Sequence, residues 1–222
     1  MIAPLPMLQA ILSPADLLTT LGERYATKKF DPSKKIPHET WHALEESMRL
    51  SPSSFGIQPW WFIVVDTPEI RARLLPVSWG QSQITDADRL VVFATLKQVE
   101  NKHVRHYIED MAQTRGLRPE DLAGFEQMLQ TAMMPKANIE WNRRQSYIAM
   151  GFLGLSAALL GVDTCMLEGI DPTAYDNILG LTDTDYATVA AVACGYRASE
   201  DDTIPEKRAK SRFPLDEVVR HV

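Results

Sequence analysis

A short polar loop directly before an apolar run is the part of the chain best suited to bind a small ligand. Its small and hydrogen-bonding residues are Pro52, Ser53, Ser54, Gly56 and Gln58. Serine hydroxyls and amide groups can hydrogen-bond an anion or the edge of a flat heteroaromatic ring, and a glycine lets such a ligand come close. Serine and glycine also favour turns, so the loop alone is equally well explained as a helix end followed by a connecting turn.

Basic residues gather near the two ends of an acidic chain, whose net charge is −6 at pH 7. The first group contains Arg24, Lys28 and Lys29, and the second contains Lys207, Arg208, Lys210 and Arg212. Because the planar fork of arginine donates two parallel hydrogen bonds to a phosphate, two such groups favour a small anionic ligand. The alternative is that each group is ordinary solvated surface charge.

Two further segments complete the set of candidate binding residues. They are Gly80-Gln81-Ser82-Gln83 and, after an apolar run, Met166-Leu167-Glu168-Gly169. In order and spacing, these segments, the serine loop and the two basic groups resemble the FMN-dependent nitroreductase family, in its oxygen-insensitive nitroreductase and flavin reductase branch. The resemblance extends from Leu17 to Val219.

The resemblance implies that residues from both ends of the chain hold the FMN phosphate. Arg24, Lys210 and Arg212 match the family positions that do so. Tyr25 and Ala26 follow in the same cofactor-binding segment. We therefore expect the early arginine and the late basic pair to lie close together in the fold.

The resemblance also implies how the flavin ring is held. Lys28 matches a lysine at the pyrimidine side of the ring, where a cation stabilises the negative charge of the reduced flavin. Gly80 and Gln83 fall near the same edge. The backbone amides of Glu168 and Gly169 match those that approach N5 and O4, and the serine loop matches one that reaches the flavin from the other subunit.

Four residues depart from the family pattern. Ala26 lacks a hydroxyl at the phosphate end, and Met166 stands where proline is common. Gly56 and Gly80 replace asparagines, the second of which hydrogen-bonds the ring in many relatives. Each lost hydrogen bond is worth about 0.5–1.5 kcal/mol. We expect these changes to weaken FMN or shift its potential without removing the charged contacts.

No residue is predicted to be a dedicated acid, base or nucleophile. The five histidines form no triad or metal pattern, and His103 and His106 are interpreted as part of a solvated helix face. This agrees with flavin chemistry, in which Lys28 and the backbone of Glu168 only tune the cofactor. Because the chain has no Gly-x-Gly-x-x-Gly motif, NADH or NADPH would stack on the flavin instead of binding a Rossmann site.

Caps and apolar periodicity predict the elements that position these residues. A helix over residues 14–24, capped by Ser13, should turn three leucines inward: Leu17, Leu18 and Leu21. A helix after Pro37 should bury Trp41, Leu44 and Met48. Buried strands are predicted at residues 60–65, 90–95, 163–167 and 187–194, and a long helix at 137–160.

These elements, together with the resemblance, predict an α+β fold of the nitroreductase type. It has a central, mostly antiparallel sheet flanked by helices, in an intertwined homodimer. With 222 residues, 45% of them hydrophobic, the chain is expected to form one domain, 1–222. Its parts are an N-terminal extension at 1–12, a variable lid region at 98–134 and a tail at 203–222 that docks on the partner subunit.

Composition excludes several other classes of protein. The acidic balance argues against nucleic acid as a partner. Two cysteines in predicted strands imply neither a disulfide framework nor a metal site. Residues 1–6 lack the pattern of a secretory signal, and the most apolar stretch, 147–162, is shorter than the roughly 20 residues of a membrane span. A cytoplasmic protein without a membrane partner is expected.

The function predicted is FMN-dependent NAD(P)H oxidoreductase activity on a small-molecule oxidant. Nitroaromatics, quinones or flavins would be reduced by two electrons in a ping-pong reaction. One alternative keeps the fold and changes the acceptor, as in a flavin-dependent enone reductase or a dehalogenase-like relative. Another is a non-catalytic flavin-binding dimeric module, suggested by Ala26, Gly56 and Gly80. The sequence does not distinguish NADH from NADPH or identify the physiological acceptor.

Overall fold

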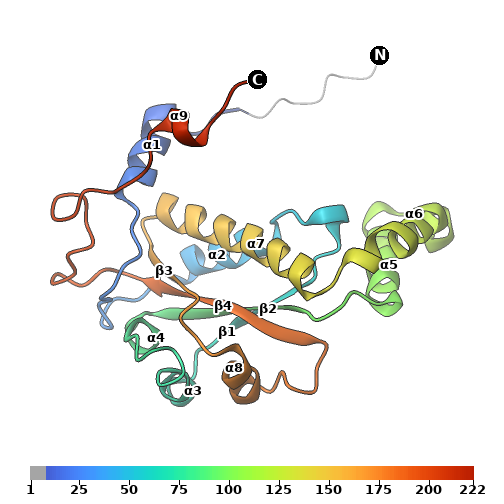
Figure 1. Ribbon diagram of the computed structural model, residues 1–222, viewed down its shortest axis with the longest axis horizontal. Coiled ribbons are helices and arrows are strands. Elements are labelled where there is room, and N and C mark those ends of the chain that lie inside the picture. Colours follow the sequence, from blue (N-terminus) through green and yellow to red (C-terminus); the bar gives the residue numbers. More distant parts are fainter. Residues whose placement is uncertain (1–8) are drawn as a thin grey trace.

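A four-stranded antiparallel sheet forms the centre of the protein (Figure 1). The computed structural model describes residues 9–222, so residues 1–8 of the predicted N-terminal extension lie outside the described part. The strand order is β1 (Trp60–Val64), β2 (Arg89–Leu96), β4 (Tyr186–Gly195) and β3 (Asp163–Leu167). Each neighbouring pair is antiparallel, which confirms the predicted type of sheet.

Helices surround the sheet and connect its strands. The α-helices are α1 (Pro14–Glu23), α2 (His38–Arg49), α3 (Pro68–Leu74), α4 (Gln83–Asp86), α5 (Asn101–Arg115), α6 (Ala123–Met128), α7 (Ile139–Leu159), α8 (Pro172–Leu179) and α9 (Leu215–Val218). Shorter helical segments are η1 (Ser54–Gly56), η2 (Pro119–Leu122), η3 (Leu129–Met133) and η4 (Met134–Lys136). The predicted long helix at 137–160 is α7.

The sheet separates two apolar cores, which the alternating side chains of β2 supply in turn. Val91 and Phe93 face α2 and α7, while Leu90 and Val92 face α3 and α8 (Figure 1). The predicted core residues of α2 are all buried: Trp41, Leu44 and Met48. Because β2 is covered on both faces, its strand is apolar at nearly every position.

Helix α1 begins as predicted but packs differently. The Ser13 hydroxyl accepts a hydrogen bond from the Asp16 amide at 3.1 Å, which caps the helix. The inward orientation predicted for its leucines is wrong, because Leu17, Leu18 and Leu21 are 37%, 69% and 40% exposed. The reason is that α1 and α9 form an arm outside the body, where α1 finds little of its own chain to pack against (Figure 1).

Strand β1 is an edge strand and is only half covered. Trp61 is 47% exposed and stacks on Tyr186 of β4, with ring centroids 4.3 Å apart and planes at 6°. The predicted buried strand at 60–65 forms, but it is buried only at Trp60 and Val65 and half-covered or exposed between them. Apolar runs do not distinguish a central strand from an edge strand, since that depends on which other strands pair with it.

The predicted lid region forms a helical lobe at the opposite end of α7 from α1 (Figure 1). It contains α5 and α6, and Gly116 ends α5 in the left-handed conformation with φ 64°. The lobe has a separate apolar core, which includes Val104, Ile108, Leu129 and Met133. Within residues 9–222, no helix combines the length and apolarity needed to cross a membrane.

Candidate functional site

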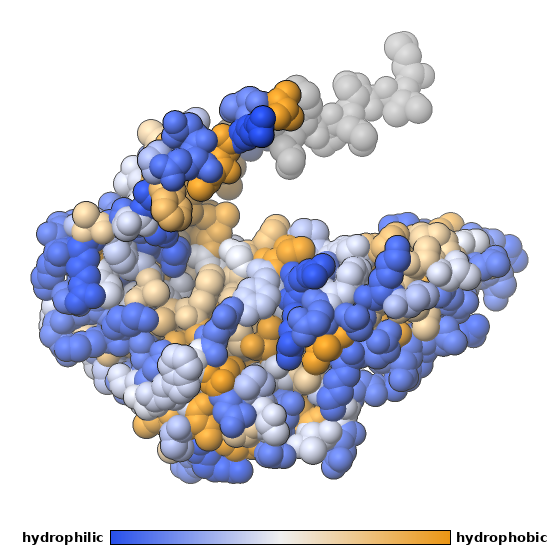
Figure 2. All heavy atoms as spheres, viewed as in Figure 1, coloured by the Kyte–Doolittle hydropathy of each residue, from blue (hydrophilic) through white to orange (hydrophobic). Residues whose placement is uncertain are grey.

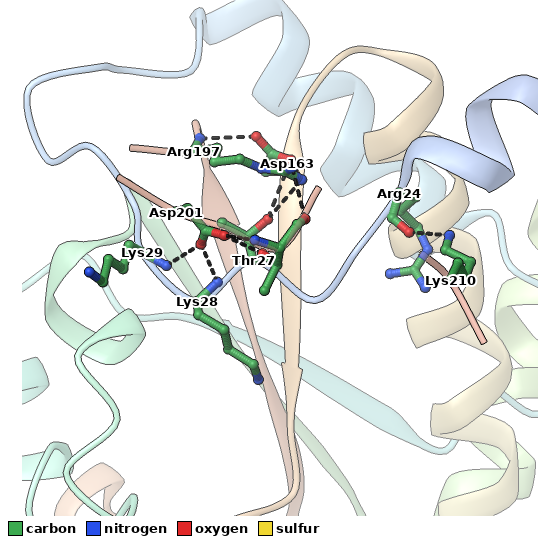
Figure 3. A network of polar contacts seen from close by, with 9 residues as sticks. Arg24, Thr27, Lys28, Lys29, Asp163, Arg197, Asp201 and Lys210 are labelled. Atoms are coloured by element: carbon green, nitrogen blue, oxygen red, sulfur yellow. Dashed lines mark hydrogen bonds and ion pairs between the residues drawn. The ribbon is translucent and has the colours of Figure 1, made fainter. Parts of the chain in front are cut away.

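The basic C-terminal segment lies against the end of α1, as predicted, although 189 residues separate Lys210 from Leu21. The Lys210 ammonium donates hydrogen bonds to the carbonyl oxygens of Leu21 and Arg24 (Figure 3). The Tyr25 hydroxyl donates to the Arg208 carbonyl. These bonds satisfy carbonyls that the end of a helix leaves free. They also show that the first half of the tail is anchored on its own subunit.

Three cations of this region lack an acidic partner. In the part of the chain that the structure describes, Arg24, Lys210 and Arg212 form no ion pair with a carboxylate. Burial lowers the pKa of Lys210, and the positive charges of Arg24 and Arg212 lower it further. A neighbouring cavity of about 180 Å³ is lined by Arg24, by the end of α7 and by the acidic residues Glu23 and Asp163, the second of which is paired with Arg197. Cations that have no carboxylate partner are the groups best able to bind a phosphate.

The loop that carries Lys28 is held by a buried carboxylate. One oxygen of Asp201 accepts the backbone N–H groups of Lys28 and Lys29 at 2.7 and 2.5 Å (Figure 3). The other accepts the Thr203 amide at 2.6 Å and the Thr203 hydroxyl. Burial alone would raise the pKa of Asp201, but these hydrogen bonds outweigh it and lower the pKa. Asp201 therefore fixes the backbone from which Lys28 projects.

Lys28 and Gln83 come together over one thiol, although they are far apart in sequence. The Lys28 ammonium lies 3.8 Å and the Gln83 amide nitrogen 3.9 Å from the sulfur of Cys165 on β3. Burial raises the pKa of Cys165, so the thiol stays neutral and accepts hydrogen bonds weakly. Both donors thus retain capacity for a better acceptor, such as a carbonyl or ring nitrogen of a flavin.

The segment after β3 forms a tight turn beside the second candidate segment. The Ile170 amide donates to the Glu168 carbonyl at 2.8 Å, and the Gln81 side chain donates to the Gly169 carbonyl at 3.1 Å. A side chain at position 169 would collide with the ring of Trp79, which explains why glycine stands there. Leu167 is buried and anchors the turn, whereas Met166 is 40% exposed. At Gly80 the backbone is left-handed, with φ 65°, a conformation that glycine adopts readily.

Glu168 has a partner that sequence reasoning missed. The hydroxyl of Tyr147, on the exposed face of α7, donates to the Glu168 carboxylate. Burial and this carboxylate together raise the pKa of Tyr147 to about 12, so the hydroxyl remains a donor near neutral pH. The pair ties the turn to α7. No sequence motif indicates it, because the two residues are 21 positions apart on different elements.

Within one chain, the serine loop lies away from the other candidate residues. The Ser54 amide donates to the side chain of Gln145 in the first third of α7, at 2.9 Å. The cavity beside Arg24 includes Ala158, thirteen residues further along the helix. At 1.5 Å per residue this separation is about 20 Å. The serine loop and the cavity beside Arg24 are therefore well separated within a single subunit.

The serine loop itself is rigid and packs on the lid lobe. The Ser53 hydroxyl accepts the Gln58 amide at 2.9 Å, which closes the loop that begins at Pro52. The Tyr107 hydroxyl of α5 donates to the Phe55 carbonyl at 2.9 Å and leaves no space for a side chain at Gly56. This contact explains why a glycine stands at position 56.

Within residues 9–222, no three side chains of His, Cys, Asp or Glu lie together as a possible metal site. Both ring nitrogens of His103 already have partners nearby in the fold. Its Nδ1 accepts the Glu100 amide at 2.9 Å, and its Nε2 lies 3.3 Å from the Asp185 carboxylate. The fit is instead to an organic cofactor with an anionic end and a polar ring edge.

Comparisons with known proteins agree with this geometry. A sequence model of the nitroreductase family matches residues 21–196. A proposed NAD(P)H nitroreductase of Staphylococcus haemolyticus is 32% identical over 217 residues, which are 93% of this chain and 97% of that protein. A proposed nitroreductase from Exiguobacterium sibiricum, solved in complex with FMN, superposes with a TM-score of 0.75 at 21% identity, over 96% of this chain and 99% of the other.

An enone reductase of gut-bacterial fatty acid saturation shares the fold as well. It superposes with a TM-score of 0.73 at 23% identity, over 95% of this chain and 100% of its own. At this identity the likeness concerns the fold and not the substrate. The family match and the full-length relative settle the classification: the chain belongs to the nitroreductase family of oxidoreductases.

Proposed function

We propose that the protein is an FMN-dependent NAD(P)H oxidoreductase that reduces small-molecule oxidants such as nitroaromatics, quinones or flavins by two electrons. The observation that carries the proposal is the cluster of Arg24, Lys210 and Arg212, which forms no ion pair with a carboxylate within residues 9–222, together with the Lys28–Gln83 donor pair. The Staphylococcus relative is named for the same electron donor, and the Exiguobacterium relative binds FMN.

In this proposal FMN, when bound, supplies the chemistry of accepting and donating a hydride. Arg24 and Arg212 bind its phosphate, and Lys210 holds the two segments together while adding positive charge. Lys28 stabilises negative charge at the pyrimidine edge, and Asp201 holds the loop from which Lys28 projects. The nicotinamide donor and the acceptor occupy one position in turn, which is the structural basis of a ping-pong reaction.

We further propose that each site is completed by a second copy of the chain. The separation of about 20 Å along α7 between the serine loop and the Arg24 cavity supports this arrangement. Apolar side chains that one chain leaves about 40% exposed support it too: Leu21, Ile148, Phe152, Leu155 and Leu159. Those of α7 recur at helical spacing and form one stripe, which a partner subunit would cover.

The arm formed by α1 and α9 is the second surface available for dimerisation. Phe213, Leu215 and Val218 are 76%, 74% and 64% exposed, and Figure 2 shows hydrophobic atoms on this arm where it stands away from the body. Since the tail is anchored on its own subunit as far as Lys210, docking on a partner falls to residues 211–222 in this proposal. The intertwined dimer then needs only this last segment to cross over.

The lid region, 98–134, is the element proposed to select the acceptor. Its Tyr107 hydrogen-bonds Phe55 of the serine loop. The conformation of the lid therefore affects the part of the site that would reach the partner's flavin. An enone acceptor would need a different lid and the same cofactor residues. The fold shared with the enone reductase keeps that candidate open for direct assay.

The proposal is tested by the visible spectrum and the half-reaction. The purified protein, loaded with FMN, should be yellow, and its flavin band should bleach when NADH or NADPH is added without oxygen. Reoxidation by a quinone or nitroaromatic should restore the band. A protein that holds FMN but does not bleach would be the non-catalytic binding module, and one that cannot be loaded with FMN would contradict the cofactor assignment.

A further inference from the structure

Trp79 combines two features that each cost free energy. Its side chain is 82% exposed, although tryptophan is a large apolar residue that is usually well buried. Its backbone is left-handed, with φ 55°, a conformation that bulky residues rarely adopt. Such strain persists only where the surroundings enforce it, and it concentrates at sites that bind ligands.

The surroundings of Trp79 are rigid. The hydroxyl of the preceding Ser78 donates to the Leu74 carbonyl at 2.6 Å and lies 2.7 Å from the buried Tyr175 hydroxyl. The Gln81 side chain bridges the carbonyls of Ser78 and Gly169, at 3.1 Å each. The turn is thus fastened to α3, to α8 and to the segment after β3. The exposed position of the indole is therefore fixed by a hydrogen-bonded turn.

The indole lies directly against Gly169. Two of its ring carbons are 2.7 and 2.9 Å from the point where a side chain at position 169 would begin. One part of the ring therefore faces the turn whose amides are proposed to approach the reactive end of the flavin. The exposed Trp61 differs, because its face is covered by Tyr186. Within residues 9–222, no aromatic ring stacks on Trp79.

We propose that Trp79 forms an aromatic wall of the acceptor position and stacks on the ring of a planar aromatic substrate. The inference rests on the proposed function and deepens it, since it selects planar aromatic acceptors over aliphatic ones. An indole offers a large rigid face with little conformational entropy to lose, and ring stacking is favourable beyond the area it buries. Trp79 is thus a specificity-determining residue and takes no part in hydride transfer.

The test measures binding of two redox-inert acids to the oxidised, FMN-loaded protein by calorimetry. Naphthalene-2-carboxylate offers a planar aromatic ring, and cyclohexanecarboxylate offers the same charge without one. We expect Trp79→Ala to raise the dissociation constant of the naphthoate about 3- to 10-fold and Trp79→Phe to raise it less. Binding of the cyclohexane acid and retention of FMN should change less than about twofold for both variants.

Several outcomes would overturn the inference. Equal naphthoate affinity in wild type and Trp79→Ala would show that the indole does not contact the ligand. A parallel loss for both acids would mean that the variant distorts the pocket. A change from dimer to monomer in Trp79→Ala, measured by light scattering, would place the indole in the subunit interface. Failure of the wild-type protein to bind FMN would contradict the proposed function instead, so the two failures are distinguishable.

Discussion

Figure 3 shows two arginines in different electrostatic surroundings: Arg197 lies against the Asp163 carboxylate, whereas Arg24 lies beside Lys210. The Arg197 guanidinium donates to the Asp163 carboxylate at 2.8 Å and to the Thr203 carbonyl at 2.9 Å. Arg24 forms no ion pair with a carboxylate in the part of the chain described, and the Lys210 ammonium hydrogen-bonds its carbonyl oxygen. The comparison shows that charge compensation, and not residue type, separates an arginine that stabilises the fold from one available to a ligand.

The two regions also differ in what they do to stability. The network of Thr27, Asp163, Arg197 and Asp201 joins the N-terminal loop to β3 and to the segment after β4. Each of its carboxylates is balanced by hydrogen bonds or a cation. The cationic cluster instead holds like charges together, so it should oppose folding slightly until an anion binds.

The largest expected effect is that of Asp201→Asn. An amide has one accepting oxygen and would direct an NH₂ group at backbone donors, so we expect the free energy of unfolding to fall by about 3 kcal/mol in urea denaturation. Glu200→Gln is the matched control, because that neighbouring side chain is exposed and bonds only Ser199. Equal stability of the two variants would mean that Asp201 does not hold the Lys28 loop.

Arginine truncations without cofactor compare the two regions directly. Arg197→Ala removes the partner of Asp163 and should cost roughly 2.5 kcal/mol of unfolding free energy. Arg24→Ala removes only repulsion and should leave the stability of the FMN-free protein unchanged or slightly higher. If both variants lose the same stability, the distinction between compensated and uncompensated arginines fails.

For FMN affinity the opposite is expected: loss of an arginine without a carboxylate partner should matter more than loss of a paired one. Arg212→Ala is expected to raise the dissociation constant of FMN about 30-fold, or about 2 kcal/mol, because a phosphate oxygen loses its charged donor. Arg208→Ala, in the same tail, is the control, since its guanidinium pairs with Asp202 at 2.6 Å. Fluorescence titration of FMN measures both, and unchanged affinity in Arg212→Ala would remove this residue from the phosphate site.

Lys28→Ala should act on rate more than on binding. Loss of the ammonium leaves the negative charge of the reduced ring less stabilised, so we expect flavin reduction by NAD(P)H to slow about tenfold, or about 1.4 kcal/mol. FMN affinity should change less. Stopped-flow absorbance follows the reduction, and Lys28→Arg should recover part of the rate. An unaltered rate in Lys28→Ala would exclude the role.

The smallest expected effect is the pH dependence of stability. Since the pKa of Asp201 is lowered below its usual value of 3.8, its stabilisation is present above that value and is lost as the pH falls through the folded-state pKa. We expect part of the acid-induced loss of stability to be missing in Asp201→Asn, because an asparagine has no carboxylate to protonate. Urea denaturation at a series of pH values from 5 down to the pH of acid unfolding measures this difference. The same pH dependence of the unfolding free energy in wild type and Asp201→Asn would contradict it.

Sequence reasoning reached the sheet and the order of the binding segments because both depend on local signals. The strand of Leu90 to Thr95 is apolar at nearly every position, as expected of a strand covered on both faces, and Ser13 caps α1 as predicted. The convergence of Arg24 and Lys210 came from the family resemblance and not from any local pattern. Their contact in the fold is a finding of the structure.

The residues that sequence reasoning missed act across long separations. Asp201 binds a loop 173 residues earlier, and nothing near it in sequence marks it as more than one of several acids. The inward face predicted for Leu17 and Leu21 is wrong because periodicity identifies an apolar face and not the surface that covers it. The roles of Tyr147 and Trp79 likewise depend on their contacts with Glu168 and Gly169, which only the fold creates.

The sequence by itself determined the class of fold, the family and the cationic and small residues offered to a cofactor, since caps, apolar alternation and motif spacing are properties of short segments. Tertiary structure alone decided which charges are compensated and which remain free. It also placed the serine loop and Arg24 at opposite ends of α7. The physical reason is that charge compensation and distance depend on what folding brings within a few ångströms, and neighbours along the chain do not determine that.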